Sequence, residues 1–346
     1  MFADDWALVA QCKTFEEVQT ILEDDLQIVN EYFCSARLLI NSNKTEVCAF
    51  YLNNKEAERK MEVSFQNQVL KHNFKPKYLG VILDRSLTYK ENLEKLSMKL
   101  RTRLNIIRML AGTEWGASPD TLRISTLSLM YNTMNYSSPV WINSAHTNKI
   151  DTQINAALRV ISATLKGTAL QWLYVICNIA PPGLLRIKQY KNTIENSILY
   201  ENSVLYNVLE DPVIHRLRSR ITWDTFFNNI KNFKLDVEWR LAWENDQVVN
   251  SHLINDPTSK VPGFNLTRIS WKNLNRIRSN CGRCNYNLHK WNIIDNKDCP
   301  CGATEQTIGH IICFCPNTYF EGDIFELHNA KTERAMLYLE NLTVNL

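Results

Sequence analysis

Apolar positions in the first third of the chain follow two patterns, one typical of helices and one typical of short strands. Residues 18–33 carry apolar side chains at the three- and four-residue spacing of an amphipathic helix. Thr14 and Glu17 precede this run at the spacing of a capping box. Short apolar runs predict strands over residues 6–10, 46–51, 62–66, 69–72 and 78–83. This order of elements predicts an α+β region.

Helical spacing dominates from about residue 89 onward. A leucine-rich stripe over residues 93–107 predicts one helix, and Ser118 with Pro119 gives the capping residue and first-turn proline of another. Further helices are predicted over 150–165 and 184–209. The polar, proline-containing residues 245–262 predict a linker.

Composition narrows the class of protein. With 45% hydrophobic and 22% charged residues, the chain is neither wholly disordered nor collagen-like. It has ten glycines and none of the glycine-rich phosphate-binding strings. No run approaches the ~20 apolar residues of a membrane span, and the acidic start is unlike a secretory leader. We therefore expect an intracellular, reducing location and no membrane partner, and the pattern leaves the oligomeric state open.

Cysteine is unevenly distributed. Six of the ten cysteines fall between Cys281 and Cys315, and the other four are spread over the preceding residues. A local cluster that includes a histidine is typical of a metal site, because a disulfide scaffold spreads its cysteines through the chain. The candidate zinc ligands have the spacing Cys-x-Cys-x8-His-x4-Cys: Cys299, Cys301, His310 and Cys315. Cys313 is an alternative ligand, and Cys281 and Cys284 are either a second pair or small buried hydrophobic residues.

Basic side chains concentrate in two segments, although the net charge is only +3. The first segment has five basic residues and no acidic one: Lys95, Lys99, Arg101, Arg103 and Arg108. On a helix they predict contact with a phosphate backbone, the alternative being a solvated face. The second segment, residues 268–297, interleaves Trp271, Tyr286 and Trp291, which either stack on unpaired bases or build a small core. Its candidates for nucleic-acid contact are Arg276, Arg278, Arg283 and Lys290.

The chain starts with Phe-Ala-Asp-Asp at residues 2–5. Paired carboxylates in a tight turn bind Mg²⁺, which activates an attacking hydroxyl and neutralises departing pyrophosphate in nucleotidyl transfer. Taken alone, such a pair more often belongs to a solvated turn. It is followed by Asn-Ser-Asn-Lys-Thr-Glu at 41–46 and by Lys-Tyr-Leu-Gly-Val-Ile-Leu-Asp at 77–84.

This ordered series resembles the second half of the reverse transcriptase palm, specifically that of jockey-like non-LTR retrotransposons. The resemblance continues over the basic segment at 93–110. It includes further short motifs at 179–182, 274–278, 282–284, 289–291 and 299–316. It covers most of the chain, with weaker matches between about 190 and 265. The resemblance rests on the order and spacing of the motifs, since each motif alone is unspecific.

The resemblance implies an α+β chain in four parts: a carboxyl-terminal part of the palm (1–84), a helical thumb (85–165), a helical connector and linker (166–262), and a basic carboxyl-terminal region with the Cys/His module (263–346). It implies that Asp4 and Asp5 bind Mg²⁺ and that Lys44 protonates the leaving pyrophosphate in RNA-directed DNA synthesis. It implies an RNA template and a DNA primer as partners. Zinc gains support, since Cys-x-Cys followed by His-x4-Cys-Pro is characteristic of these carboxyl-terminal segments.

The chain departs from the family in its magnesium site. In the family, an aspartate on a palm strand tens of residues before the acidic turn completes that site. Here the acidic turn stands at residues 2–5. Two metal ions need more carboxylates than Asp4 and Asp5 supply. We therefore expect an amino-terminally truncated polymerase that binds nucleic acid without copying it. Two alternatives remain: a zinc-dependent RNA- or DNA-binding protein derived from the element, and a remnant without function.

Overall fold

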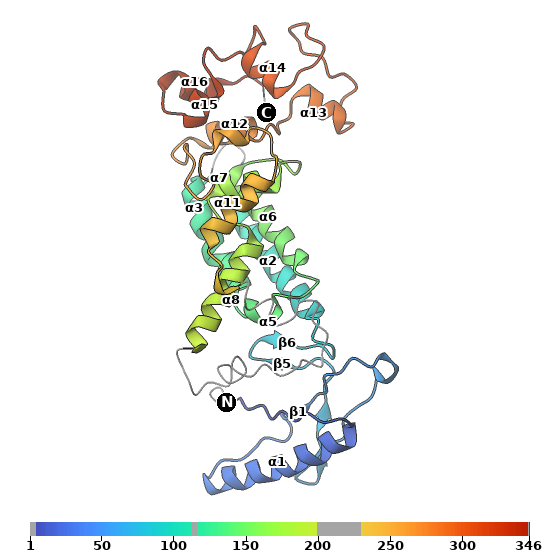
Figure 1. Cartoon of the computed structure of the whole chain (residues 1–346). Coiled ribbons are helices and arrows are strands. Elements are labelled where there is room, and N and C mark those ends of the chain that lie inside the picture. The colour runs from blue at the N-terminus through green and yellow to red at the C-terminus, as the bar shows by residue number, and fades with distance from the viewer. Residues whose placement is uncertain (1–4, 113–115, 199–229, 345) are drawn as a thin grey trace. The chain divides into compact units, whose positions relative to one another are not determined.

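The computed structural model describes residues 5–112, 116–198, 230–344 and 346, and the chain divides into two compact units. Of the described residues, the first unit comprises 5–93 and Ser144–His146, and the second comprises the others (Figure 1). Helices predominate and the strands are short, so the architecture is α+β. None of the described helices is long and apolar enough to cross a membrane.

The first unit packs around one long helix, α1 (Phe15–Ser35). The Thr14 hydroxyl accepts a hydrogen bond from the Glu17 amide at 3.2 Å, and the Glu17 carboxylate accepts one from the Thr14 amide. The capping box predicted from the sequence is thus confirmed. Leu22 and Leu26 of α1 are buried in a small core with five residues from the segment that follows: Val47, Met61, Val63, Phe65 and Leu70.

Within the described part of the first unit, two-residue strands pair in twos. β1 (Glu46–Val47) is parallel to β4 (Lys71–His72), β2 (Ser64–Phe65) is antiparallel to β3 (Gln68–Val69), and β5 (Lys77–Tyr78) is antiparallel to β6 (Val81–Ile82). A short 3₁₀ helix, η1 (Asn54–Glu56), lies between β1 and β2 along the chain. Four of the predicted strand runs contain these strands. Two of these strands, β3 and β5, begin one residue before the predicted run, at Gln68 and Lys77. The prediction of a strand over residues 6–10 is wrong, because these residues form none.

The second unit is helical. Its elements in chain order are most of α2 (Lys90–Leu110), α3 (Pro119–Thr126), the π-helical turn η2 (Leu127–Tyr131), α4 (Asn132–Asn135), α5 (Ser138–Trp141), α6 (Asn148–Ser162), α7 (Leu170–Cys177), α8 (Pro182–Ile198), α11 (Leu235–Asn245), the 3₁₀ helix η3 (Ser251–Leu253), α12 (Arg268–Arg278), α13 (Asn285–Lys290), α14 (Ile308–Cys313), α15 (Ile324–Asn329) and α16 (Glu333–Asn341). Ser118 caps α3 as predicted. The predicted helix over 184–209 is described only as far as residue 198.

The segment predicted to be a linker packs into a tryptophan-rich core of the second unit. Leu253 and Val261 are buried there with Trp172 of α7. The indole nitrogen of Trp172 donates a hydrogen bond to the Val249 carbonyl at 2.9 Å. The polar composition that suggested a linker therefore belongs to a loop whose few apolar residues are buried.

The carboxyl end of α6 meets one face of α12. The last carbonyls of a helix have no partner within the helix, and α12 supplies side-chain donors for them. The contacts run from Trp271 to the Ile161 oxygen (2.9 Å), from Asn275 to the Ser162 oxygen (3.0 Å), from Arg276 to the Ala163 oxygen (3.1 Å), and from Arg268 to the Val160 and Ile161 oxygens. The guanidinium groups also carry positive charge to the negative end of the helix dipole.

Replacing Arg268 tests how much this junction contributes to stability. Arg268→Met keeps most of the apolar stem and leaves the Val160 and Ile161 carbonyls without these donors. We expect the free energy of unfolding to fall by about 2–4 kcal/mol, since hydrogen bonds from a charged donor are lost in a buried setting. Guanidinium unfolding followed by tryptophan fluorescence measures this. Arg283→Met is the matched control, because Arg283 is exposed, and an equal loss in both variants would contradict the assignment.

Candidate metal centre and nucleic-acid surface

The structure brings together the four side chains at the Cys-x-Cys and His-x4-Cys positions. One ligand atom from each of Cys299, Cys301, His310 and Cys315 lies within 4.8 Å of all the others. The sulfurs of Cys299 and Cys315 are 3.8 Å apart, and the Cys301 sulfur is 3.2 Å from Nε2 of His310. Three thiols and an imidazole are a donor set that zinc takes in tetrahedral geometry, for which ligand separations near 4 Å are required.

Local backbone geometry explains how such close cysteines converge. The Gly302 amide donates to the Cys299 carbonyl at 2.9 Å, and the Cys299 amide donates to the Ala303 carbonyl at 2.8 Å, which closes a tight turn. Gly302 has a φ of +96°, which residues with a side chain rarely adopt. The turn therefore requires glycine at this position.

Helix α14 supplies the second half of the site. The hydroxyl of Thr307 caps it by accepting a hydrogen bond from the His310 amide at 3.0 Å. The Cys315 amide in turn donates to the His310 carbonyl at 2.8 Å. This turn at the end of α14 places the His310 and Cys315 side chains in the same cluster.

Electrostatics in the cluster favour a thiolate at Cys315. Burial opposes that charge, but hydrogen bonds from Thr318, the Asn317 amide and the neighbouring thiols outweigh it and lower the pKa of the Cys315 thiol. Burial raises the pKa of the Cys299 thiol. A metal bound to the cluster would favour the thiolate form of all three cysteines.

The remaining cysteines of the carboxyl-terminal part lie outside this cluster. Cys313, the alternative ligand, is exposed and does not belong to the group of converging atoms. Cys284 is buried in an apolar core with Leu274 and Ile277. Cys281 is also buried. The sequence analysis overlooked Gln306, whose amide nitrogen lies 3.8 Å from the Cys299 sulfur, because a lone glutamine carries no spacing signal.

The described residues do not assemble a magnesium site around the acidic pair. Asp4 lies outside the described residues, and Asp5 is exposed. Lys44 is exposed in the turn before β1. Across the described part of the chain, no set of three metal-binding side chains includes Asp5. The roles of Asp4, Asp5 and Lys44 in catalysis therefore stay predictions.

Helix α2 presents most of its basic residues to solvent. Lys95, Lys99, Arg101 and Arg108 are exposed, whereas the Arg103 side chain is half-buried and donates to the Leu129 carbonyl of η2. The leucine-rich stripe is buried on the opposite side, at Leu93, Leu100, Leu104 and Ile107. Four of the five predicted residues are thus exposed on α2.

The second basic segment is divided between core and surface. The Arg278 guanidinium is fully buried and donates hydrogen bonds to His328, Asn275 and the Pro262 carbonyl. Arg276 is half-buried and donates hydrogen bonds to the Ala163 and Leu346 carbonyls. Both guanidinium groups therefore have acceptors within the fold.

The other two predicted residues of this segment lie at the surface. Arg283 and Lys290 are exposed, and so are the neighbouring Tyr286 and Trp291. Trp271, by contrast, is fully buried, so its ring belongs to the core. Only Arg283 and Lys290 therefore remain as surface candidates from the second segment.

Comparison with known proteins gives one partial relative. No family model matches the chain, and no solved structure matches it. Over 109 residues the chain is 30% identical to the RNA-directed DNA polymerase from mobile element jockey of Drosophila funebris. The aligned stretch is 32% of this chain and 12% of that protein. The similarity supports a relationship to retrotransposon reverse transcriptases, in agreement with the resemblance seen in the motifs.

The metal centre is testable with a pair of cysteine variants. We expect the purified chain to bind one zinc ion, and Co²⁺ in its place to give the visible absorption of a tetrahedral thiolate site. Cys301→Ser removes one converging sulfur and should abolish that spectrum. Cys313→Ser changes an exposed cysteine outside the cluster and should leave it intact. Loss of the spectrum in Cys313→Ser alone would overturn the ligand assignment.

Proposed function

We propose that the chain is a nucleic-acid-binding protein derived from a jockey-like retrotransposon polymerase. Helix α2 and the zinc-binding module would contact the phosphate backbone of RNA or DNA. The observation that carries this proposal is the set of exposed basic residues on α2, for which no described carboxylate forms an ion pair. The partial similarity to the jockey polymerase supports a nucleic acid as the partner.

The spacing on α2 gives two pairs of basic residues on different sides of the helix. Lys95 and Lys99 are one helical turn apart, and Arg101 and Arg108 are two turns apart, so each pair shares a side, and the two pairs lie about 150° apart around the axis. With 1.5 Å of rise per residue, the segment from Lys95 to Arg108 is roughly 20 Å long. Phosphates on a nucleic acid strand recur every few ångströms, so each pair can reach phosphates of a strand on its own side of the helix.

Zinc would contribute by joining two pieces of the module. Cys299 and Cys301 lie on the turn before α14, and His310 and Cys315 lie on α14 and just after it. A metal bound to all four would hold that turn against the helix. Arg283 and Lys290 lie in the segment before this turn and add exposed positive charge.

Nucleic-acid binding and DNA synthesis are separate activities, and only binding is proposed for this chain. RNA-directed DNA synthesis is the activity named for the jockey protein, and the aligned stretch is 12% of that protein. A primer-extension assay with an RNA template decides whether the chain copies nucleic acid as well as binding it. A zinc-dependent binding protein and a remnant without function both lack extension, and only the binding protein retains salt-dependent affinity for RNA.

Neutralising α2 tests the proposal directly. We expect the triple variant Lys95→Gln, Lys99→Gln, Arg101→Gln to bind RNA and DNA of any sequence more weakly. The slope of log affinity against log salt should fall in magnitude by about 2–3, since each lost phosphate contact removes just under one unit. Fluorescence anisotropy with a labelled oligonucleotide at several salt concentrations measures both quantities.

A control variant separates local contact from net charge. Lys55→Gln, Lys60→Gln, Lys331→Gln removes the same charge from exposed lysines elsewhere. It should keep nearly the whole slope. If the two triple variants lose the same slope, the nucleic-acid surface is not on α2.

A further inference from the structure

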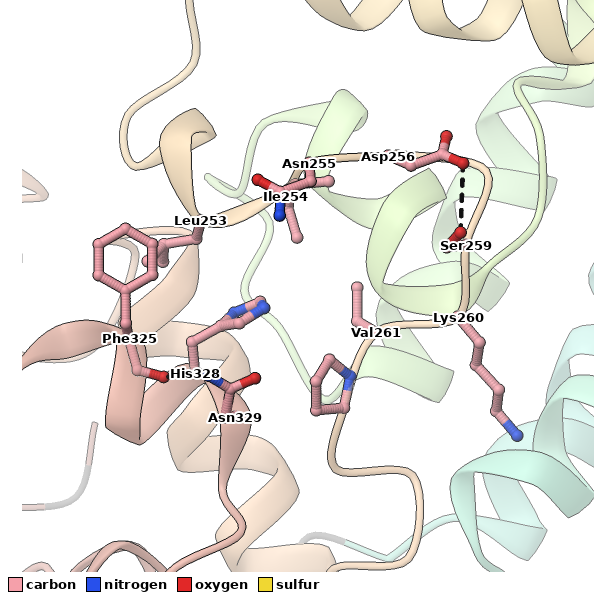
Figure 2. Close-up of a pocket in the computed structure, with 11 residues that line it drawn as sticks. Leu253, Ile254, Asn255, Asp256, Ser259, Lys260, Val261, Phe325, His328 and Asn329 are labelled. Carbon is pink, nitrogen blue, oxygen red and sulfur yellow. Dashed lines mark hydrogen bonds between the residues drawn. The ribbon is translucent and has the colours of Figure 1, made fainter.

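A cavity of about 290 Å³ lies between the loop that follows η3 and helix α15 (Figure 2). Its apolar walls come from Leu253, Val261, Pro262 and Phe325. The polar residues of its rim include Asp256 and Lys260. Both rim charges are compensated, Asp256 by Arg240 at 3.0 Å and Lys260 by Asp120 at 2.8 Å. The rim is therefore nearly neutral, and the walls suit a flat apolar ligand.

One polar side chain points into this cavity from below the rim. His328 is 7% exposed, and Figure 2 shows its ring directed toward the loop that carries Ile254 and Val261. Nδ1 of His328 accepts a hydrogen bond from Nε of Arg278 at 3.1 Å. A neutral imidazole that accepts at Nδ1 carries its proton on Nε2. Among the described residues, none is recorded as accepting a hydrogen bond from that Nε2.

The charge behind His328 strengthens this donor. Arg278 is fully buried, and its recorded acceptors are all neutral: the His328 ring and carbonyl, Asn275 and the Pro262 carbonyl. Desolvation and the nearby guanidinium both disfavour a protonated imidazole and lower the pKa of His328 to about 3. The imidazole therefore stays neutral near pH 7, with a polarised N–H facing the cavity.

We propose that this cavity binds a single unpaired nucleobase. An acceptor on the edge of the base would take the free hydrogen bond from His328 Nε2, and its faces would lie against Phe325 and Val261. A base combines a flat apolar face with an edge of hydrogen-bond acceptors, which is what these walls and this donor match. The inference rests on the proposed function, because it assigns to a nucleic-acid-binding chain a site for one base of a single strand.

Nucleosides test the cavity apart from phosphate binding. Adenosine, cytidine and uridine carry no phosphate, so their binding does not depend on the basic face of α2. With ¹⁵N-labelled histidine, we expect at least one nucleoside to shift the His328 Nε2 resonance saturably, with a Kd in the millimolar range. His328→Gln identifies the resonance.

Two variants make the site falsifiable without disturbing the buried histidine. Asn255 is an exposed residue of the cavity lining, and Asn255→Trp adds bulk there, so nucleoside affinity should fall at least ~10-fold. His252 is exposed and contacts Phe325 edge-on at 5.5 Å between ring centroids, but it does not line the cavity. His252→Gln should therefore bind nucleosides as the unaltered chain does.

Other outcomes overturn the inference. It is wrong if no nucleoside shifts His328, if Asn255→Trp binds as well as the unaltered chain, or if inorganic phosphate shifts the resonance and nucleosides do not. Salt-dependent oligonucleotide binding that persists without nucleoside binding would reject the base site and leave the proposed function standing. Nucleoside binding in a chain whose oligonucleotide affinity does not depend on α2 would support the base site and reject the proposed role of α2.

Discussion

The carbonyl groups at the carboxyl end of α6 need partners, and the second unit is organised around the helix that supplies them. One face of α12 donates hydrogen bonds from Trp271, Asn275 and two arginines to these oxygens. Trp271 belongs to the tryptophan-rich core, whereas Leu274 and Ile277 belong to the core of the carboxyl-terminal module. Helix α12 therefore belongs to both cores at once. Losing its donors would expose unsatisfied carbonyls where the two cores meet.

The basic residues of the chain therefore fall into two groups with different contacts. A guanidinium group has five donors and remains charged, so it can satisfy several carbonyls and complement a helix dipole as well as bind phosphate. Arg268 and Arg276 take the first role in α12. Lys95, Lys99, Arg101 and Arg108 of α2 are exposed, and together with the exposed Arg283 and Lys290 they stay the candidates for phosphate contact.

Local signals in the sequence predicted the parts of the fold that depend on near neighbours. The capping box at Thr14 and the cap at Ser118 are set by residues within a few positions, and both were predicted. Spacing also predicted which four side chains converge near α14. The burial of Arg278 depends on His328, fifty positions away, and no short-range pattern signals it. The packing of Leu253 and Val261 was missed for the same reason, since the core they enter is built by distant helices.

The proposed function depends above all on phosphates being contacted by exposed basic residues. The most direct measurement is the affinity of the unaltered chain for a single-stranded RNA of ~20 nucleotides across 50–200 mM potassium chloride. If Lys95, Lys99, Arg101, Arg108, Arg283 and Lys290 each contact a phosphate, log affinity should fall against log salt with a slope of about −4. A slope near zero, or no binding at the lowest salt concentration, would contradict the account.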